Sequence, residues 1–360
     1  MRVRCACLLA VAAAPAWAAS TISAPAAAAP ASPVSSLAGG TIVGALAAPP
    51  SPSFLARVRD GLVGGVILTG HWSSQAEMSA TTARLQAAAC VAGAPLLVGV
   101  DQEGGRVRRL PWAAPADSPR ALGALGDPDR VRQEAADAAG GLRLAGVDVD
   151  FAPVADVVSI PSSFLGSRSF SRDPAVAAKL AAAFVQGLQS AGIAATAKHF
   201  PGLGAAPANT DDKAVVVRAD AATLTRGLAP FRSAIAAGTR LVMISSASYP
   251  ALDATASPAV FSRPIVSGLL RGKLGFRGVI VTDALDAPAA AATPHAPAHA
   301  IAAGVDLLLY TSERASEAGY ASLLADASAS PALRRQLTAA IGRIDALKRW
   351  LAEAGGPSCP

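Results

Sequence analysis

Short runs of apolar, often β-branched residues recur eight times along the chain and alternate with longer stretches rich in Ala, Leu and Arg. The short runs have the character of buried parallel strands, and the longer stretches show the spacing of helices that pack through one face. The eight expected strands are residues 41–46, 65–69, 96–101, 147–151, 194–200, 241–245, 278–283 and 305–310. This alternation predicts an α/β protein with a single-domain (β/α)8 TIM barrel, whose active site forms at the carboxyl ends of the strands.

An open, doubly wound parallel sheet is the competing architecture. Such a sheet usually carries a glycine-rich fingerprint directly after its first strand, and no such motif follows Leu46. The composition also fits helices packed on a parallel sheet, because 52% of the residues are hydrophobic but only 4% are aromatic. The closed barrel is therefore the favoured fold.

Three segments between or after the strands carry clear local signals. Asp173-Pro174 forms a helix start before residues 175–189, and a C-terminal helix is expected over residues 329–354. Residues 288–297, which are rich in Pro and Ala, follow the seventh strand. We expect this last segment to be a mobile loop over the mouth of the barrel.

The first residues of the chain have the layout of an export signal. Arg2 and Arg4 precede the apolar run 5–14, and residues 16–18 read Ala-Trp-Ala, a small-x-small cleavage site. A buried or membrane-spanning helix is the alternative, but the run is much shorter than the roughly 20 residues that a bilayer requires. The residue directly after the cleavage point, Ala19, is not a cysteine that could accept a lipid. We therefore expect a secreted protein, extracellular or associated with the cell wall, without stable membrane insertion.

These boundaries divide the chain into four expected parts. They are a signal peptide (1–18), a flexible Ala/Pro/Ser-rich leader (19–36), the barrel (37–355) and a short tail (356–360). The net charge of +6 is mild, and no basic stripe with interleaved aromatic residues indicates nucleic-acid binding. We expect a monomer.

Two cysteines, Cys90 and Cys359, remain after the predicted signal peptide is removed. In an oxidising compartment they can form a disulfide that fastens the C-terminal tail to the barrel. The alternative is a buried free thiol at Cys90 and a frayed terminal Cys359. Both interpretations are open at this point.

Charged residues occur at the carboxyl ends of four predicted strands. The segments are Asp101-Gln102-Glu103-Gly104-Gly105-Arg106, Asp150-Phe151-Ala152-Pro153, Lys198-His199-Phe200-Pro201-Gly202 and Thr282-Asp283. A charge at the end of an apolar strand is costly unless it is paired or hydrated. Because these ends meet at one rim of a barrel, the pattern predicts an active site there.

The residues at this rim resemble the signatures of glycoside hydrolase family 3, particularly its β-N-acetylhexosaminidase branch. The similarity extends over roughly residues 38–310 and keeps the family's order of motifs. The matching segments are Val100 to Val107 (VDQEGGRV), Leu165 to Ser171 (LGSRSFS), Lys198 to Gly202 (KHFPG), Tyr249 to Asp253 (YPALD) and Val281 to Leu285 (VTDAL).

The resemblance implies that Asp283 is the catalytic nucleophile, which attacks the anomeric carbon and forms a covalent glycosyl-enzyme. This carboxylate must stay ionised, and a neighbouring cation such as Lys198 would lower its pKa. The alternative role for Asp283 is a helix N-cap after the seventh strand.

The resemblance also implies a sugar-binding group, in which a carboxylate and several cations contact hydroxyl or acetamido oxygens. Its members are Asp101, Arg109, Arg168, Lys198 and His199. An alternative for His199 is a core histidine bonded to a backbone carbonyl. Glu103 is expected to fix the backbone beside its two glycines, and Asp150 and Asp156 are expected to be structural.

The general acid is where the sequence departs from the family pattern. The hexosaminidase branch has an Asp-Ser-His loop after Lys-His-Phe-Pro-Gly, and its histidine is the acid/base. The corresponding positions here are Asn209, Thr210 and Asp211, so the histidine is absent. Asp211 is the favoured replacement, since a shielded carboxyl can protonate a leaving oxygen. Asp212 and a residue of another loop are alternatives, and residues 209–213 can also be simply a solvated turn.

The expected function is hydrolysis of terminal β-linked N-acetylglucosamine from cell-wall fragments or chitin oligosaccharides, with retention of configuration. The alternatives are a β-glucosidase-like hydrolase, a phosphorylase, and a non-catalytic sugar-binding or wall-binding barrel. The carbohydrate is the only expected partner. No cofactor or metal is implied, because neither metal-ligand spacing nor a phosphate-binding glycine loop occurs.

Overall fold

The computed structural model describes residues 33–161 and 163–359. The predicted signal peptide and most of the predicted leader therefore lie outside the described residues. Helix α1 (Val34–Gly39) already includes the last residues assigned to the leader, so the folded part begins slightly earlier than expected. Within the described residues, no helix is long and apolar enough to cross a membrane.

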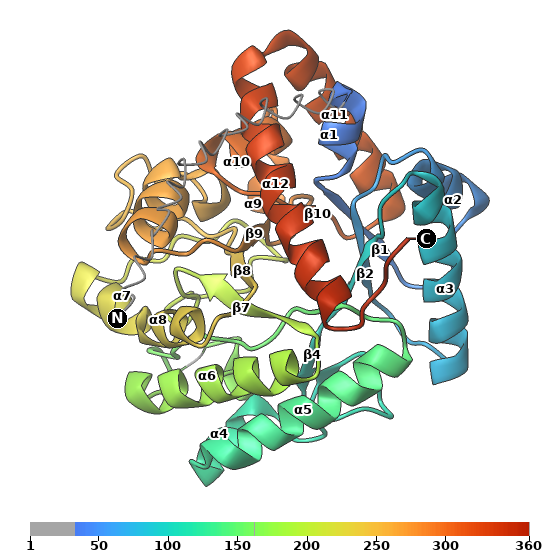
Figure 1. Cartoon of the computed structure of the whole chain (residues 1–360). Helices are drawn as coiled ribbons and strands as arrows, with labels where there is room; N and C mark the ends of the chain where they lie inside the picture. The colour runs from blue at the N-terminus through green and yellow to red at the C-terminus, as the bar shows by residue number, and fades with distance from the viewer. Residues whose placement is uncertain (1–32, 162, 360) are drawn as a thin grey trace, which may run out of the picture. The chain divides into compact units, whose positions relative to one another are not determined.

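Eight parallel strands form the central sheet in the order β10-β1-β2-β3-β6-β7-β8-β9 (Figure 1). Their bounds are β1 Ile42–Leu46, β2 Gly65–Leu68, β3 Leu97–Val100, β6 Val149–Asp150, β7 Ala194–Phe200, β8 Leu241–Ile244, β9 Val279–Thr282 and β10 Leu308–Leu309. A parallel bridge between Val281 and Leu307 joins the two outer strands of this order. The sheet thus closes on itself, and the predicted (β/α)8 barrel is confirmed.

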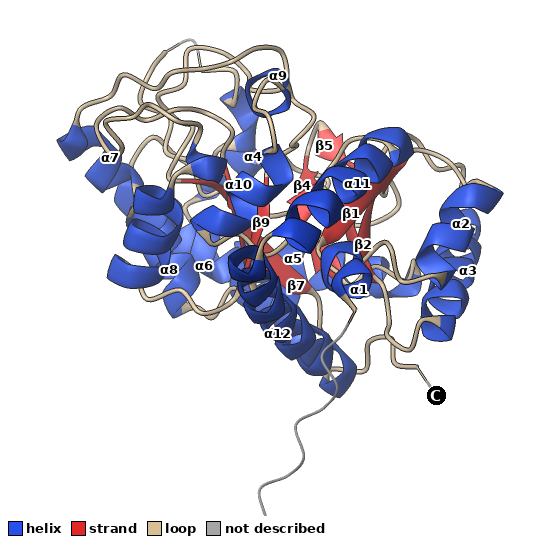
Figure 2. Cartoon of the chain, turned by 90° about the horizontal axis from the view of Figure 1, so that it is seen from above, coloured by secondary structure: helices blue, strands red, loops and turns tan. Residues whose placement is uncertain are grey.

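The helices connect successive strands and cover the outside of the barrel (Figures 1 and 2). Their bounds are α2 Pro52–Arg59, α3 Gln75–Val91, α4 Pro119–Leu125, α5 Pro128–Leu144, α6 Pro174–Ser190, α7 Ala221–Gly227, α8 Ala229–Ala236, α9 Pro288–Ala291, α10 Ala296–Ala303, α11 Glu313–Ala329 and α12 Pro331–Glu353. A π-helix spans Pro264–Lys273, short 3-10 turns span Gly166–Arg168 and Ala259–Phe261, and a hairpin pairs β4 (Gln102–Gly104) with β5 (Val107–Arg108).

Local signals explain where several helices begin. The Asp173 side chain accepts a hydrogen bond from the Ala175 backbone N–H, so the predicted N-cap of α6 is confirmed. The predicted helix 329–354 was wrong at its start. The Ser330 side chain caps α12, and Pro331 occupies the first turn, where its missing N–H costs no hydrogen bond.

The predicted mobile loop 288–297 is not a loop over its whole length. Residues 288–291 form α9, and Ala296 begins α10. Alanine has the highest helix propensity of all residues, and proline is tolerated in the first turn of a helix, where each of these two helices carries one. A Pro/Ala-rich composition therefore permitted a short helix as well as a loop.

Helix α12 closes the amino-terminal end of the barrel. Its residues Ile344, Leu347 and Leu351 are buried with the side chains that fill the barrel interior, among them Val43, Ile67 and other strand residues. Figure 2 shows α12 and α9 at opposite ends of the barrel. The carboxyl ends of the strands are thus left as the end available for an active site.

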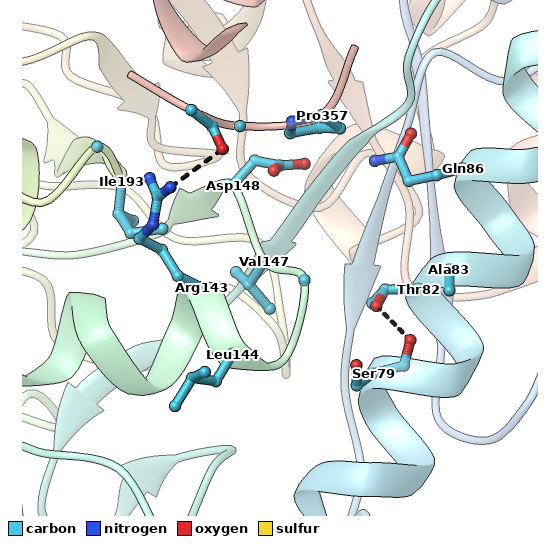
Figure 3. Close-up of a pocket in the computed structure, with 14 residues that line it drawn as sticks. Ser79, Thr82, Ala83, Gln86, Arg143, Leu144, Val147, Asp148, Ile193 and Pro357 are labelled. Atoms are coloured by element: carbon cyan, nitrogen blue, oxygen red, sulfur yellow. Dashed lines mark hydrogen bonds between the residues drawn. The ribbon is translucent and has the colours of Figure 1, made fainter. Parts of the chain in front are cut away.

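A disulfide joins Cys90, at the end of α3, to Cys359 in the tail, with 5.2 Å between their Cα atoms. The tail also lines a cavity of about 350 Å³ beside Asp148, at the amino-terminal end of β6 (Figure 3). The polar groups of this cavity largely serve the backbone: the Arg143 guanidinium, for instance, donates to the carbonyl oxygens of Ala191 and Ala354. This cavity is far from the charged strand ends that the sequence singled out, and we assign it a structural role.

Candidate active site

A second cavity of about 350 Å³ opens at the carboxyl ends of the strands. Side chains from several strand ends and the loops that follow them meet there. All seven residues for which the sequence predicts roles at the active site line it: Asp101, Arg109, Arg168, Lys198, His199, Asp211 and Asp283. The barrel geometry therefore gathers residues that are up to 182 positions apart along the chain.

Asp283 directly follows β9. Its backbone N–H donates to the Ile244 carbonyl oxygen at 2.8 Å, and its Oδ1 accepts from the Ala284 backbone N–H at 2.9 Å. The next helix, α9, has Ala287 as its N-cap residue, so the alternative role of Asp283 as a helix cap is excluded. The carboxylate is held by its own strand end and faces the cavity.

Burial raises the pKa of the Asp283 carboxyl above its ordinary value. The largest opposing influence is the positive charge of His199, whereas the negative charge of Asp211 raises the pKa further. Lys198 contributes less than either. Lys198 does lower this pKa, as expected, but burial outweighs it and the pKa is raised overall.

Lys198 is 2% exposed and lies between two carboxylates. Its Nζ is 2.6 Å from an oxygen of Asp101 and 2.7 Å from an oxygen of Glu103. Although desolvation lowers the pKa of a buried ammonium group, these two carboxylates outweigh it and the pKa of Lys198 is raised. Lys198 therefore remains charged and is paired within this cluster.

Glu103 is the buried centre of the same cluster, with an exposed fraction of 1%. Besides Lys198, it accepts two hydrogen bonds from the Arg168 guanidinium, each 2.8 Å long. Burial alone would raise its pKa, but Lys198 and Arg168 outweigh burial and lower the pKa to about 2. The expectation that Glu103 fixes its local backbone was wrong. It binds two cations, which spacing along the chain did not reveal.

His199 is not bonded to a backbone carbonyl through its ring, as the core-histidine alternative supposed. Its Nδ1 lies 2.8 Å from Oδ2 of Asp156. Asp150 matches its structural expectation: its Oδ1 accepts from the Gln102 backbone N–H at 2.9 Å, and burial raises its pKa to about 8.

The loop after β7 places Asn209, Thr210 and Asp211 at the cavity. Asp211 is exposed, and its Oδ2 accepts from the Asn209 side-chain amide at 3.2 Å. Asp212 is not among the residues that line the cavity. Among the candidates from this loop, the structure thus brings Asp211, and not Asp212, beside Asp283.

The two histidines after the seventh strand lie elsewhere. His295 bonds Asp326 through Nδ1 at 2.8 Å, and the ring of His299 packs against Phe261. Neither lines the cavity. The sequence did not single out Phe164 and Tyr310, which do line it. The only sequence signal for them is proximity to a motif or a strand end.

The described residues contain no group of three or more His, Cys, Asp or Glu side chains that could hold a metal ion. The titratable side chains that line the cavity are carboxylates, cations, one histidine and one tyrosine. Two carboxylates beside a cluster of hydrogen-bond donors, at the catalytic end of a (β/α)8 barrel, define the arrangement of a glycoside hydrolase.

Comparison with known proteins agrees with this class. The family described as "Glycosyl hydrolase family 3 N terminal domain" matches residues 46–347, and the chain belongs to this family of glycoside hydrolases. A "Beta-hexosaminidase" of Nitrosomonas eutropha is 40% identical over 260 residues, which cover 69% of this chain and 73% of that protein.

Two solved structures show the same fold. The family 3 β-N-acetylglucosaminidase of Paenibacillus sp. FPU-7 superposes with a TM-score of 0.83 at 30% identity, over 92% of this chain and 64% of that one. The chain thus spans just under two thirds of the Paenibacillus protein. The β-N-acetylhexosaminidase of Beutenbergia cavernae superposes with a TM-score of 0.77 at 34% identity, over 88% of this chain and 98% of that one.

The Glu103→Gln variant tests the buried ion cluster. A carboxyl with a folded pKa of about 2, against 4.5 when unperturbed, contributes stability that is fully present above pH 4.5 and is lost as the pH falls toward 2. We expect the variant to be less stable by about 3 kcal/mol at pH 7, and the difference to shrink below pH 4.5. Urea unfolding of both proteins between pH 3 and pH 7 measures this. A difference that did not change with pH would contradict the assignment.

Proposed function

We propose that this chain is a secreted, retaining exo-β-N-acetylglucosaminidase that acts on cell-wall fragments or chitin oligosaccharides. The observation that carries the proposal is the shared cavity of Asp283 and Asp211, in which the charge of Asp211 acts on Asp283. The named relatives and solved structures support the choice of an N-acetylated amino sugar. The layout of residues 1–18 supports export.

The cavity supports action on one terminal sugar. Its volume of about 350 Å³ lies at the small end of the range for ligand pockets. Asp101 and the cationic residues Arg109, Arg168 and Lys198 supply acceptors and donors for the hydroxyl and acetamido groups. Arg109 lines the same cavity, and its buried Nε has no hydrogen-bond partner among the described residues.

In the proposed mechanism, Asp283 attacks the anomeric carbon of the bound sugar while Asp211 protonates the departing oxygen. The covalent glycosyl-enzyme is then hydrolysed by water, from which Asp211 removes a proton. The pair requires one ionised and one protonated carboxyl at the start.

The substrate assignment predicts a preference between two chromogenic substrates. Aryl β-N-acetylglucosaminide should be hydrolysed at least 100-fold more efficiently, in kcat/KM, than the corresponding aryl β-glucoside, because polar groups built to hold the acetamido group are left unpaired without it. Steady-state rates in phosphate-free buffer measure this. Equal efficiency would favour a β-glucosidase-like enzyme, dependence on added phosphate would favour a phosphorylase, and sugar binding without turnover would favour a non-catalytic barrel.

The role of Asp211 predicts an effect that depends on the leaving group. In Asp211→Asn, kcat/KM for an unactivated disaccharide should fall by about 100-fold or more, whereas a dinitrophenyl glycoside, which needs no proton, should lose much less. Asp212→Asn is the matched control, since it neutralises the adjacent exposed carboxylate outside the cavity. If the Asp212 variant showed the leaving-group effect and the Asp211 variant did not, the assignment would be wrong.

A further inference from the structure

Asp283 must be ionised to act as a nucleophile, but its proposed partner Asp211 does not favour the ionised form. A nucleophilic carboxylate must be charged, yet burial raises its pKa and Asp211 raises it further. The nearby ammonium group of Lys198 is bound by Asp101 and Glu103. Of the cations that act on Asp283, His199 has the strongest effect. A group that sets the charge and orientation of His199 therefore also affects the pKa of Asp283.

Asp156 is the group that holds His199. It follows β6, is 1% exposed, and lies next to β7, where the Ala155 backbone N–H donates to the Lys198 carbonyl oxygen at 2.6 Å. Its Oδ2 lies 2.8 Å from His199 Nδ1 and 3.2 Å from the His199 backbone N. Its Oδ1 accepts from the Leu203 backbone N–H at 2.6 Å. The carboxylate thus fixes both the backbone and the ring of the histidine.

An ionised carboxylate can only accept hydrogen bonds. Its short contact with Nδ1 therefore requires a proton on Nδ1, so that the other ring nitrogen, Nε2, is the one left for the cavity. The negative charge of Asp156, 2.8 Å from Nδ1, also attracts any positive charge that the ring carries.

We propose that Asp156 is a positioning residue for the hydrolytic reaction: it fixes the Nδ1–H form of His199, directs Nε2 toward the sugar, and stabilises a positive charge on the ring beside Asp283. Asp156, His199 and Asp283 then form a chain from the loop after β6, through β7, to the end of β9. This inference rests on the proposed role of Asp283 as the nucleophile.

No hydrogen bond or ion pair to the His199 ring is found for the other titratable groups that lie near it among the described residues. Lys198 precedes it on β7 and is paired as described above. Asp211 shares the cavity but carries the same sign as Asp283. The Tyr249 hydroxyl, buried near Asp156, donates to the Gly202 carbonyl oxygen at 3.1 Å. Asp156 is therefore the carboxylate that the structure bonds to the imidazole.

The Asp156→Asn variant separates this role from a purely structural one. The asparagine oxygen can still accept from the Leu203 backbone N–H, so the loop keeps an acceptor. Its amide N–H₂ facing Nδ1 would instead favour the opposite tautomer, with the proton on Nε2, and would remove the charge that stabilises the imidazolium. We expect kcat/KM to fall by about 100-fold or more, as expected for a lost proton-positioning interaction.

The pH profile gives the more diagnostic readout. Loss of positive charge on His199 raises the pKa of Asp283, so the acidic limb of kcat/KM should move to higher pH in the variant. The matched control is Asp148→Asn. Asp148 is also a buried aspartate that accepts one backbone N–H, from Val98 at 3.1 Å, but it lies at the opposite end of the barrel. In the control variant, the acidic limb of the kcat/KM profile should lie at the same pH as in the wild-type protein.

Nitrogen-15 NMR of the imidazole rings tests the inference without any turnover. The signal of His199, identified by its loss in His199→Gln, should show a protonated Nδ1 in the wild-type full chain and in Asp148→Asn. In Asp156→Asn it should change to the Nε2–H form. An unprotonated Nδ1 in the wild-type protein would overturn the proposal even if the variant failed to fold.

The remaining outcomes distinguish this inference from the proposed function. If the tautomer and the acidic limb were unchanged in folded Asp156→Asn, the positioning role would be wrong while Asp283 could still be the nucleophile. If Asp283→Ala kept full activity but the NMR result held, the proposed function would fail and the histidine geometry would stand.

Discussion

The pairing of buried charges at the carboxyl end of the barrel is the constraint on which the site depends. Lys198 and Glu103 are almost fully buried, and either charge alone would be strongly unfavourable there. Their contact, extended by Asp101 and Arg168, joins the loops after β3 and β6 to strand β7. The same groups line the candidate active-site cavity, so its shape and its charge have a common origin.

This pairing also sets the electrostatics of the proposed nucleophile. Because Lys198 is committed to two carboxylates, its charge is largely compensated before it acts on Asp283. His199 is instead the cation that most lowers the pKa of Asp283. Asp156 in turn contacts the His199 ring. The adjacent residues Lys198 and His199 thus have different tasks: one organises the cavity wall, and the other acts on the reacting carboxylate.

The periodicity of the sequence was sufficient to predict the barrel, since all eight apolar runs became strands whose ends differ from the expected ones by at most three residues. It was also sufficient to locate the site, because strand ends of a closed barrel converge by geometry. It did not reveal which charges pair. Glu103 binds Arg168 and Lys198, which lie 65 and 95 positions further along the chain.

The acid loop and the segment 288–297 show the other limit of sequence reasoning. The residue types at Asn209 to Asp212 permitted either of two aspartates, and only the path of the loop puts Asp211 at the cavity. Similarly, the composition of residues 288–297 suits both a loop and a short helix, and in the structure residues 288–291 form α9. Where several local structures have similar energies, long-range contacts decide among them.

The central claim is that Asp283 forms a covalent bond with the sugar. Incubation with a 5-fluoro-N-acetylglucosaminyl fluoride, which forms the glycosyl-enzyme faster than it is hydrolysed, followed by mass spectrometry of proteolytic peptides, tests it directly. We expect one added glycosyl group, on the peptide containing Asp283, and none in Asp283→Ala. A labelled residue other than Asp283, or rapid turnover of the reagent by Asp283→Ala, would contradict it.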